Sequence, residues 1–194
     1  MTGDDTRSEV MLVRHGETEW TISGQHTGRT DVPLTDAGRE HARRIGERLA
    51  GRRFAFVLSS PMQRALETCR LAGFGDVATT SDDVKEWDYG DYEGRTTADI
   101  RTEHPDWSLW RDGVPNGETA AQVGERADRV IARLRAIGGT SIVFSHGHFL
   151  RVLAARWVEL APTDGARFAL EPASLSVLGW ERETPVLTGW NNTP

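Results

Sequence analysis

Short apolar runs alternate with segments of helical periodicity along most of the chain. The runs are rich in Val, Ile, Leu and Phe, and a continuous apolar run of this kind is typical of a strand buried within a sheet. The segments expected to form strands are residues 10–13, 54–58, 141–144, 174–180 and 186–190.

Between these runs, apolar residues recur every three or four positions, which predicts amphipathic helices with one buried face. Thr35 is expected to cap the first helix, and Pro61 is expected at the first helical position of the second. Gly138 marks the end of the longest helix, because glycine readily adopts the backbone conformations that end helices. The expected helices are residues 35–51, 61–72, 97–103, 118–137 and 148–160.

Strands that alternate with helices predict an α/β fold, here a three-layer sandwich with a mostly parallel central sheet and helices on both faces. We expect a single domain over residues 10–190, preceded by a flexible tail of residues 1–9. Residues 86–117 are rich in Trp, Asp, Gly and Thr and are longer than a typical connection. This segment is expected to form a small cap over a functional site within the domain.

Composition narrows the classes of protein that fit. The chain has 194 residues, a formal net charge of −6 and a single cysteine, Cys69. This length fits one domain, and one cysteine leaves no internal disulfide, which favours a reducing compartment. The acidic balance argues against nucleic acid and anionic membrane surfaces as partners, because both require an extended basic face. A homo-oligomer stays open.

The first residues are polar and contain no apolar stretch of signal-peptide length. No run approaches the roughly 18 apolar residues of a membrane-spanning helix. The expected location of the protein is therefore the cytoplasm.

Three polar clusters directly follow predicted strands. Arg14 and His15 follow the first strand, Arg64 lies shortly after the second, and His146 follows the third. The carboxyl ends of the strands are where open α/β sheets bind ligands. An arginine offers a planar fork for phosphate oxygens, and a histidine can act as nucleophile, acid–base group or donor. The clusters indicate a site for a small phosphorylated ligand at this edge.

Six motifs follow one another along the chain, at residues 12–20 (LVRHGETEW), 27–38 (TGRTDVPLTDAG), 60–68 (SPMQRALET), 86–94 (EWDYGDYEG), 115–119 (PNGET) and 143–147 (VFSHG). In this order they resemble the motifs of the histidine phosphatase superfamily, in its phosphoglycerate-mutase-like branch. They extend from about residue 10 to residue 160, so the resemblance covers most of the chain.

The resemblance implies a role for each catalytic candidate. His15 resembles the nucleophile that accepts the phosphoryl group. Arg14, Arg64 and His146 resemble the clamp that holds the phosphate oxygens, where most of the catalysis of phosphoryl transfer would arise. Glu86 resembles the general acid that protonates the leaving oxygen and then activates water for hydrolysis of the phosphohistidine.

Five further residues are expected to bind substrate or to line its pocket. The family often has an asparagine where this chain has Thr21, and a hydroxyl can replace an amide as donor. His146 and His148 also have the spacing of a metal pair, but further ligands are lacking, so we expect no metal and no cofactor. The substrate-binding candidates are Thr21, Thr27, Gly28, Gly147 and His148.

The resemblance leaves three functions open. The first is a metal-independent, acid-phosphatase-like phosphomonoesterase that hydrolyses small phosphorylated metabolites through a phosphohistidine. The alternatives are a cofactor-dependent phosphoglycerate mutase and a non-catalytic module that binds phosphorylated ligands. The chain is shorter than typical mutases, and the segment between Gly94 and Gly117 holds only three arginines and no lysine, few basic groups for a substrate carboxylate. These features favour the phosphatase.

Overall fold

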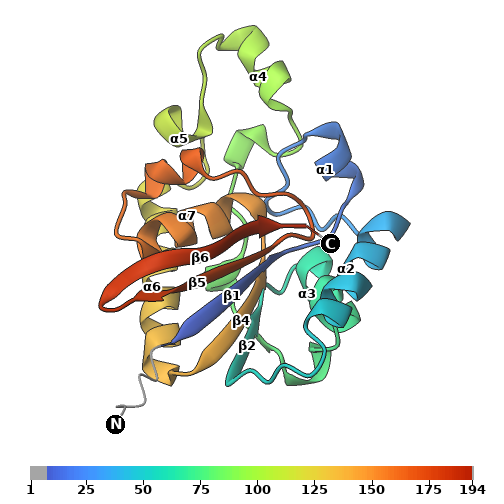
Figure 1. Cartoon of the computed structure of the whole chain (residues 1–194). Coiled ribbons are helices and arrows are strands. Elements are labelled where there is room, and N and C mark those ends of the chain that lie inside the picture. The colour runs from blue at the N-terminus through green and yellow to red at the C-terminus, as the bar shows by residue number, and fades with distance from the viewer. Residues whose placement is uncertain (1–7, 194) are drawn as a thin grey trace.

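The computed structural model describes residues 8–193, whose central feature is a six-stranded mixed sheet (Figure 1). The strand order is β3-β2-β4-β1-β5-β6. The first four strands in this order are mutually parallel, whereas β5 runs antiparallel to β1, and β6 runs antiparallel to β5. The strands are β1 (Glu9–Arg14), β2 (Phe56–Ser59), β3 (Thr79–Thr80), β4 (Thr140–Ser145), β5 (Leu175–Glu181) and β6 (Thr184–Asn192).

Three of the parallel strands end at the same edge of the sheet. Arg14, the last residue of β1, lies opposite Ser145, the last residue of β4. Ser59, the last residue of β2, lies opposite Phe144. The polar clusters that follow these strands therefore begin side by side, as parallel strands require.

Helices cover both faces of this sheet. They are α2 (Asp36–Arg48) and α3 (Gln63–Leu71) on one face, and α6 (Ala120–Ile137) and α7 (Gly147–Trp157) on the other. In β1, Val10 and Leu12 pack with α6 and α7, whereas Met11 and Val13 pack with α2 and α3. None of these four side chains is more than 2% exposed, because alternate residues of a strand point to opposite faces. The expected three-layer α/β fold is confirmed.

The sequence predicts two helix ends correctly. The Thr35 hydroxyl accepts a hydrogen bond from the N–H of Gly38 at 3.0 Å and so caps α2. Gly138, with a φ of 71°, ends α6.

The predicted start of α3 is wrong. Pro61 lies before the helix, which begins at Gln63. The N–H of Gln63 donates to the carboxylate of Asp31 at 2.8 Å, so a distant loop supplies the cap. Ser60 Oγ accepts from the N–H of Met62 at 3.3 Å and also lies 2.8 Å from Nε2 of His146.

Residues 86–117 rise beyond the carboxyl edge of the sheet, at the top of Figure 1. The segment contains η3 (Gly90–Tyr92), the expected short helix α4 (Thr97–Glu103), and α5 (Leu109–Asp112). The sequence did not predict α5, because four residues are too few to show a helical period. The remaining short elements are α1 (Glu19–Ser23), η1 (Gly75–Val77), η2 (Asp82–Val84) and η4 (Pro162–Arg167).

Most of the expected flexible tail, residues 1–7, lies outside the described residues. For Ser8 and Glu9, the last two residues of the expected tail, the expectation of flexibility is wrong. Glu9 begins β1, and Ser8 is only 4% exposed and accepts a hydrogen bond from the Trp180 indole N–H at 3.0 Å. This bond and the pairing of β1 hold the start of the described chain against the sheet.

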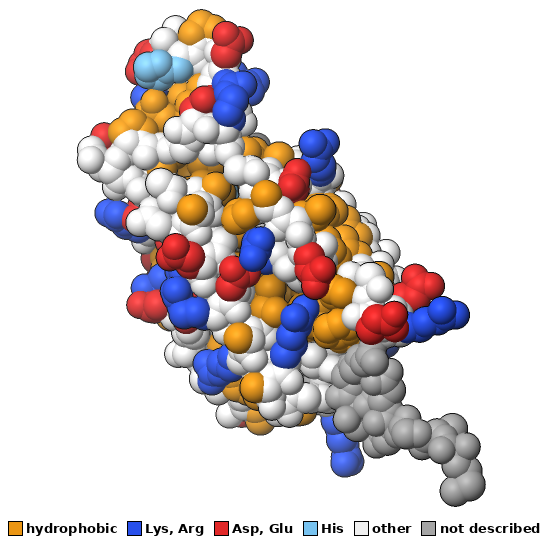
Figure 2. All heavy atoms as spheres, turned by 90° about the vertical axis from the view of Figure 1, so that its left-hand side faces the viewer, with side chains coloured by type: hydrophobic (Ala, Val, Ile, Leu, Met, Phe, Trp, Pro, Cys, Tyr) orange, Lys and Arg blue, Asp and Glu red, His pale blue; other side chains and the backbone are white. Residues whose placement is uncertain are grey.

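Acidic and basic side chains are interspersed on the face shown in Figure 2, with hydrophobic side chains between them. This face lacks the continuous basic area that binding of nucleic acid requires. Among residues 8–193, no helix combines the length and the apolar character needed to cross a membrane.

Candidate active site

A cavity of about 250 Å³ opens at the carboxyl edge of the sheet, beside residues of segment 86–117. Three of the ten predicted site residues, Arg64, His146 and Gly28, do not line this cavity and instead contact one another. The other seven line it: Arg14, His15, Thr21, Thr27, Glu86, Gly147 and His148.

His15 is held in one tautomer by its own backbone turn. Its Nδ1 lies 2.8 Å from the carbonyl oxygen of Gly16. A carbonyl only accepts, so Nδ1 carries the proton and donates, which leaves a lone pair on Nε2. The main chain of His15 is fixed as well, because its N–H donates to Ser145 at 2.9 Å and its carbonyl accepts from Ala173 at 3.0 Å.

The surroundings of His15 also keep its ring neutral. Burial, followed by the guanidinium groups of Arg64 and Arg14, lowers the pKa of His15 well below its ordinary value. The hydrogen bond to Gly16 opposes this shift without cancelling it. A neutral imidazole with a free Nε2 lone pair is the form that can attack phosphorus.

Arg14 presents an unused donor next to the cavity. One of its terminal nitrogens, Nη1, donates to the carbonyl of Leu170. Its Nε is buried and, within residues 8–193, has no hydrogen-bond partner. Gly147 leaves room beside this group, since a Cβ at that residue would lie 3.2 Å from Nε. A buried N–H without a partner is costly, and an anion in the cavity is a suitable acceptor for it.

Arg64 is fully buried and is held by the loop that precedes α2. Its Nη2 donates to the carbonyls of Thr27 and Gly28 at 2.9 and 3.2 Å, and its Nη1 donates to the carbonyl of Thr30 at 3.0 Å. Its Nε lies 3.2 Å from Nδ1 of His146. Gly28, expected among the substrate-binding residues, therefore contacts the arginine.

His146 lies between Arg64 and Ser60. Because Nδ1 accepts from Arg64, Nε2 carries the proton and donates to the Ser60 hydroxyl at 2.8 Å. Burial, then the charges of Arg64 and other neighbours, lowers the pKa of His146 well below its ordinary value. Its ring centroid is 5.2 Å from that of His15. The two neutral rings and Arg64 thus form one connected group.

Glu86 is held by three backbone donors. Its Oε1 accepts from the N–H groups of Trp87 and Phe149, both at 2.9 Å. Among residues 8–193, the N–H of His148, at 3.1 Å, is the one donor to its Oε2. The bonds from His148 and Phe149 come from the first turn of α7, where free N–H groups and the helix dipole favour a carboxylate. Oε2, with a single donor, is the oxygen better placed to carry a proton.

The hydroxyls of Thr21 and Thr27 are engaged within the chain. Thr21 Oγ1 donates to the carbonyl of Thr18 at 2.8 Å and accepts from the N–H of Thr18 at 2.9 Å, which caps α1. Thr27 Oγ1 donates to the carbonyl of Gln25 at 3.1 Å. Both residues border the cavity, and their contact with substrate stays a prediction.

His148 is paired with Tyr89, which the sequence analysis did not single out. The Tyr89 hydroxyl lies 2.6 Å from Nδ1 of His148. Burial raises the pKa of Tyr89 and lowers the pKa of His148, so both groups are neutral. The two neutral groups therefore share one hydrogen bond, in which either the hydroxyl or Nδ1 is the donor. Tyr89 belongs to the motif at residues 86–94, and membership of that motif is the sequence feature that could have identified it as a site residue.

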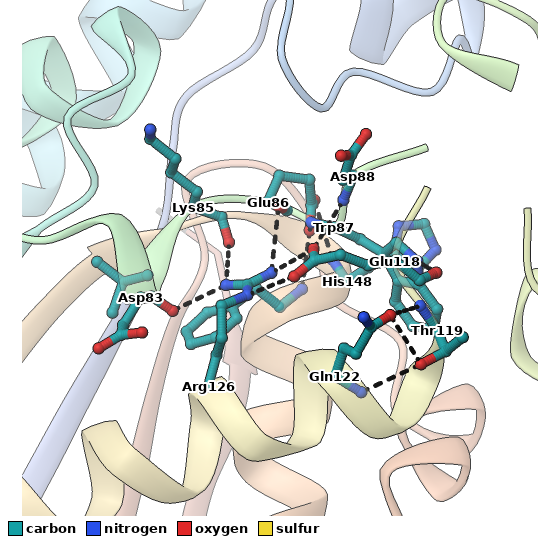
Figure 3. A network of polar contacts seen from close by, with 12 residues as sticks. Asp83, Lys85, Glu86, Trp87, Asp88, Glu118, Thr119, Gln122, Arg126 and His148 are labelled. Atoms are coloured by element: carbon teal, nitrogen blue, oxygen red, sulfur yellow. Dashed lines mark hydrogen bonds and ion pairs between the residues drawn. The ribbon is translucent and has the colours of Figure 1, made fainter. Parts of the chain in front are cut away.

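A polar network on α6 holds the segment that carries Glu86 (Figure 3). Arg126 Nε and Nη2 each lie 2.7 Å from a carboxylate oxygen of Glu118. Its Nη1 donates to the carbonyls of Asp83 and Lys85 at 2.8 and 3.0 Å, and Nη2 lies 3.4 Å from the carbonyl of Glu86. One arginine thus holds three backbone carbonyls within residues 83–86.

Glu118 completes the network from the other side. Its Oε2 accepts from the N–H of Asp88 at 3.0 Å, and its backbone carbonyl accepts from the Trp87 indole at 2.8 Å. Glu118 belongs to the motif at residues 115–119, whereas no local pattern distinguishes Arg126 from the exposed arginines of the same helix. The pair fixes the chain on both sides of Glu86.

Arg151 also lines the cavity, and sequence reasoning missed it. The one sequence feature that could have indicated a place in the cavity is its spacing. Arg151 lies one helical turn after His148, on a helix that begins at the predicted site.

Among residues 8–193, no three side chains of His, Cys, Asp or Glu converge so that they could hold a metal ion. His146 is occupied by Arg64 and Ser60, and His148 by Tyr89.

The fold and the cavity define an α/β enzyme whose site lies at the carboxyl edge of its sheet. The chain belongs to the histidine phosphatase superfamily (branch 1), whose family model matches residues 10–193, and it is a phosphatase. An acid phosphatase from Mycobacterium tuberculosis is 44% identical over 176 residues, which cover 89% of this chain and 86% of that protein.

Two further comparisons agree with this assignment. Sedoheptulose 1,7-bisphosphatase from Saccharomyces cerevisiae is 39% identical over 183 residues, covering 77% of this chain and 67% of that protein. The solved structure of an open reading frame product from Mycobacterium tuberculosis matches with a TM-score of 0.90 and 40% identity, over 96% of this chain and 98% of the other.

Proposed function

We propose that this protein hydrolyses small phosphate monoesters through a phosphohistidine on His15, with charge stabilisation supplied by its own arginines. The observation that carries the proposal is the neutral His15 ring, with a free Nε2 lone pair beside the unpartnered Arg14 Nε. This arrangement places a nucleophile and an anion-binding donor on the same cavity wall.

In the first step, the His15 Nε2 lone pair attacks phosphorus while the bond to the leaving oxygen breaks. Glu86 Oε2 gives its proton to that oxygen, so the leaving group departs as a neutral alcohol. The guanidinium of Arg14 binds the equatorial oxygens, where the charge of the loose transition state is spread. Arg64 and His146, which are hydrogen-bonded to each other next to the cavity, contribute to stabilising the same phosphoryl group.

In the second step, water attacks the phosphohistidine. Glu86, now a carboxylate, accepts a proton from the water. The new P–O bond forms as the P–N bond breaks, and the electron pair returns to Nε2 of His15. Inorganic phosphate then leaves, and Glu86 is again protonated for the next cycle.

The names of the relatives support hydrolysis of this kind. One relative is named an acid phosphatase and another a sedoheptulose 1,7-bisphosphatase. Both names describe removal of phosphate, in the second case from a sugar bisphosphate, and the family model spans nearly the whole chain. We extend to this chain the class of reaction, monoester hydrolysis, and leave the physiological substrate to experiment.

The test is phosphate release from p-nitrophenyl phosphate and from a panel of sugar phosphates between pH 4 and 8, roughly the range over which Glu and His titrate. An imidazole of ordinary pKa would be about 97% protonated at pH 5 and could not attack. Because the pKa of His15 is lowered, its lone pair persists below pH 6.5. We expect the rate at pH 5 to stay within about threefold of the rate at pH 7.

Three outcomes would contradict parts of this proposal. An acid limb centred near pH 6.5 would indicate an exposed, ordinary histidine in place of the buried one. Isomerisation of 3-phosphoglycerate faster than its hydrolysis would identify a mutase. Phosphate binding without turnover of any monoester would favour a binding module.

The Arg126–Glu118 pair is expected to position Glu86. Arg126→Met should reduce the free energy of unfolding by about 2–4 kcal/mol, because Glu118 loses its partner in a mostly buried site. The turnover of an alkyl phosphate should fall about tenfold more than the turnover of p-nitrophenyl phosphate, because only the alkyl leaving group needs a well-placed acid. Denaturant titration and steady-state kinetics measure the two effects.

Arg129 offers a matched control on the same helix. It pairs with Asp83 at 2.7 Å, but both side chains are more than a third exposed. Arg129→Met should leave both the stability and the leaving-group dependence essentially unchanged, because an exposed ion pair contributes little. Equal effects of the two substitutions would remove the special role of Arg126.

A further inference from the structure

Arg151 reaches the cavity from the leaving-group side. It lies on α7 three residues after His148, so the two share a face of the helix, about 4.5 Å apart along its axis. Both residues line the cavity. Glu86, the proposed proton donor to the leaving oxygen, is bound to the N–H of His148. A group attached to that oxygen would extend toward this part of α7.

Two elements, η4 and α5, hold the guanidinium of Arg151. Its Nε donates to the carbonyl of Gly165 at 3.0 Å and its Nη2 to the carbonyl of Ala166 at 3.2 Å, both in η4. Its Cζ lies 4.6 Å from the centroid of the Trp110 ring in α5. Gly165 is tightly enclosed, because a Cβ there would come within 2.8 Å of Trp110. The group is preorganised, and Nη1 is the nitrogen left for a ligand.

The charge of Arg151 is not matched by a carboxylate. Within residues 8–193 it makes no ion pair, whereas Arg156, five residues further along α7, pairs with Asp128 at 2.9 Å. Burial lowers the pKa of Arg151, yet an arginine stays charged at any physiological pH. Glu86, the carboxylate that lines the same cavity, already accepts three backbone hydrogen bonds. A half-buried cation in this setting favours an external anion.

The reacting phosphoryl group does not need this cation. In the proposed mechanism that group is bound to Arg14 and His15, with Arg64 and His146 behind them. Arg151 is anchored separately, on η4 and α5, so it offers a second positive centre in the same cavity.

We propose that Arg151 forms a second anion site, which binds a phosphate or carboxylate on the leaving group of the substrate. The inference rests on the proposed hydrolysis at His15 and narrows its substrates to molecules with two anionic groups. The neutral His148 lines the cavity with Glu86 and Arg151, and its ring centroid lies 5.3 Å from that of Trp110. An aromatic wall of this kind suits a short polar carbon chain.

The test compares bisphosphates of linear diols, from the three-carbon to the seven-carbon diol, with the monophosphates of the same diols. For at least one chain length, the wild-type kcat/KM should be at least about tenfold higher for the bisphosphate, the effect of one charge-assisted hydrogen bond. Arg151→Gln should remove this preference and change hydrolysis of the monophosphates by less than about threefold. A carboxylate in place of the remote phosphate should also be preferred over the neutral alcohol.

Arg156→Gln is the control, because it removes a charge from the same helix outside the cavity and should keep the preference. Unchanged monophosphate turnover shows that Arg151→Gln folds. The proposal is overturned if the wild type shows no preference for a second anion, or if Arg151→Gln slows both substrate classes equally.

A binding measurement separates this inference from the proposed reaction. In a His15→Ala background, calorimetry should show tighter binding of the bisphosphate than of the monophosphate, and Arg151→Gln should abolish the difference. Retained binding preference without any turnover in the wild type would sink the proposed function and leave the anion site standing. Turnover without binding preference would do the reverse.

Discussion

Replacing His15 with alanine is expected to abolish phosphate release, with a loss of kcat of about four orders of magnitude or more. The substitution removes the Nε2 lone pair that the Gly16 hydrogen bond and the lowered pKa keep available. Arg14 and Arg64 remain in place, so binding of inorganic phosphate should persist. Covalent labelling by a radioactive phosphoryl substrate, quenched in base, should disappear together with turnover.

Two measurements distinguish loss of the nucleophile from a general loss of folding. Added imidazole should restore part of the turnover of the His15→Ala variant by filling the space of the lost ring. His104→Ala, at an exposed histidine of segment 86–117, should leave both labelling and turnover unchanged. Labelling that survives in the His15→Ala variant would show that another residue is the nucleophile.

Glu86→Gln is expected to slow hydrolysis of alkyl phosphates by about 10²–10⁴-fold. The amide oxygen can still accept from Trp87 and Phe149, but the NH₂ group cannot give a proton and faces the N–H of His148. An alkyl leaving group needs that proton, whereas p-nitrophenolate leaves without it. The first step should therefore be lost for the alkyl ester and retained for the aryl ester.

Rapid mixing distinguishes the two steps. With p-nitrophenyl phosphate, the Glu86→Gln variant should give a burst of nitrophenolate and then slow turnover, because water attack lacks its base. With an alkyl phosphate no burst should occur. Glu103→Gln, at an exposed carboxylate of α4, serves as the control and should behave like the wild type. If the substitution slowed the first step equally for the aryl and the alkyl phosphate, the role of Glu86 as acid would be contradicted.

The central strands of the sheet were predictable because they are buried on both faces. Residues 10–13 and 141–144 are short, largely apolar runs followed by polar clusters, a pattern that favours a buried central strand. The strand ends then place Arg14, His15 and His146 at one edge. This step needs only the rule that parallel strands share their carboxyl ends.

Errors arose where a distant contact replaced a local one. Pro61 does not begin α3, because Asp31 caps the helix from another loop. Gly28 was expected at the substrate, and its carbonyl instead holds Arg64. Neither contact leaves a pattern in the neighbouring residues, since each joins segments more than 30 residues apart.

The sequence by itself determined the order of the main strands and helices along the chain. It also determined the edge of the sheet where the candidate site lies and the polar residues that follow the strands at that edge. Only the tertiary structure decided which other charges work at that edge. Arg126 and Arg151 look like the surface arginines near them in the chain. One is enclosed by Glu118 and three carbonyls, the other by Trp110 and η4. Helical spacing determines which face of a helix a side chain lies on, but packing against distant segments decides whether that face meets solvent or a cavity.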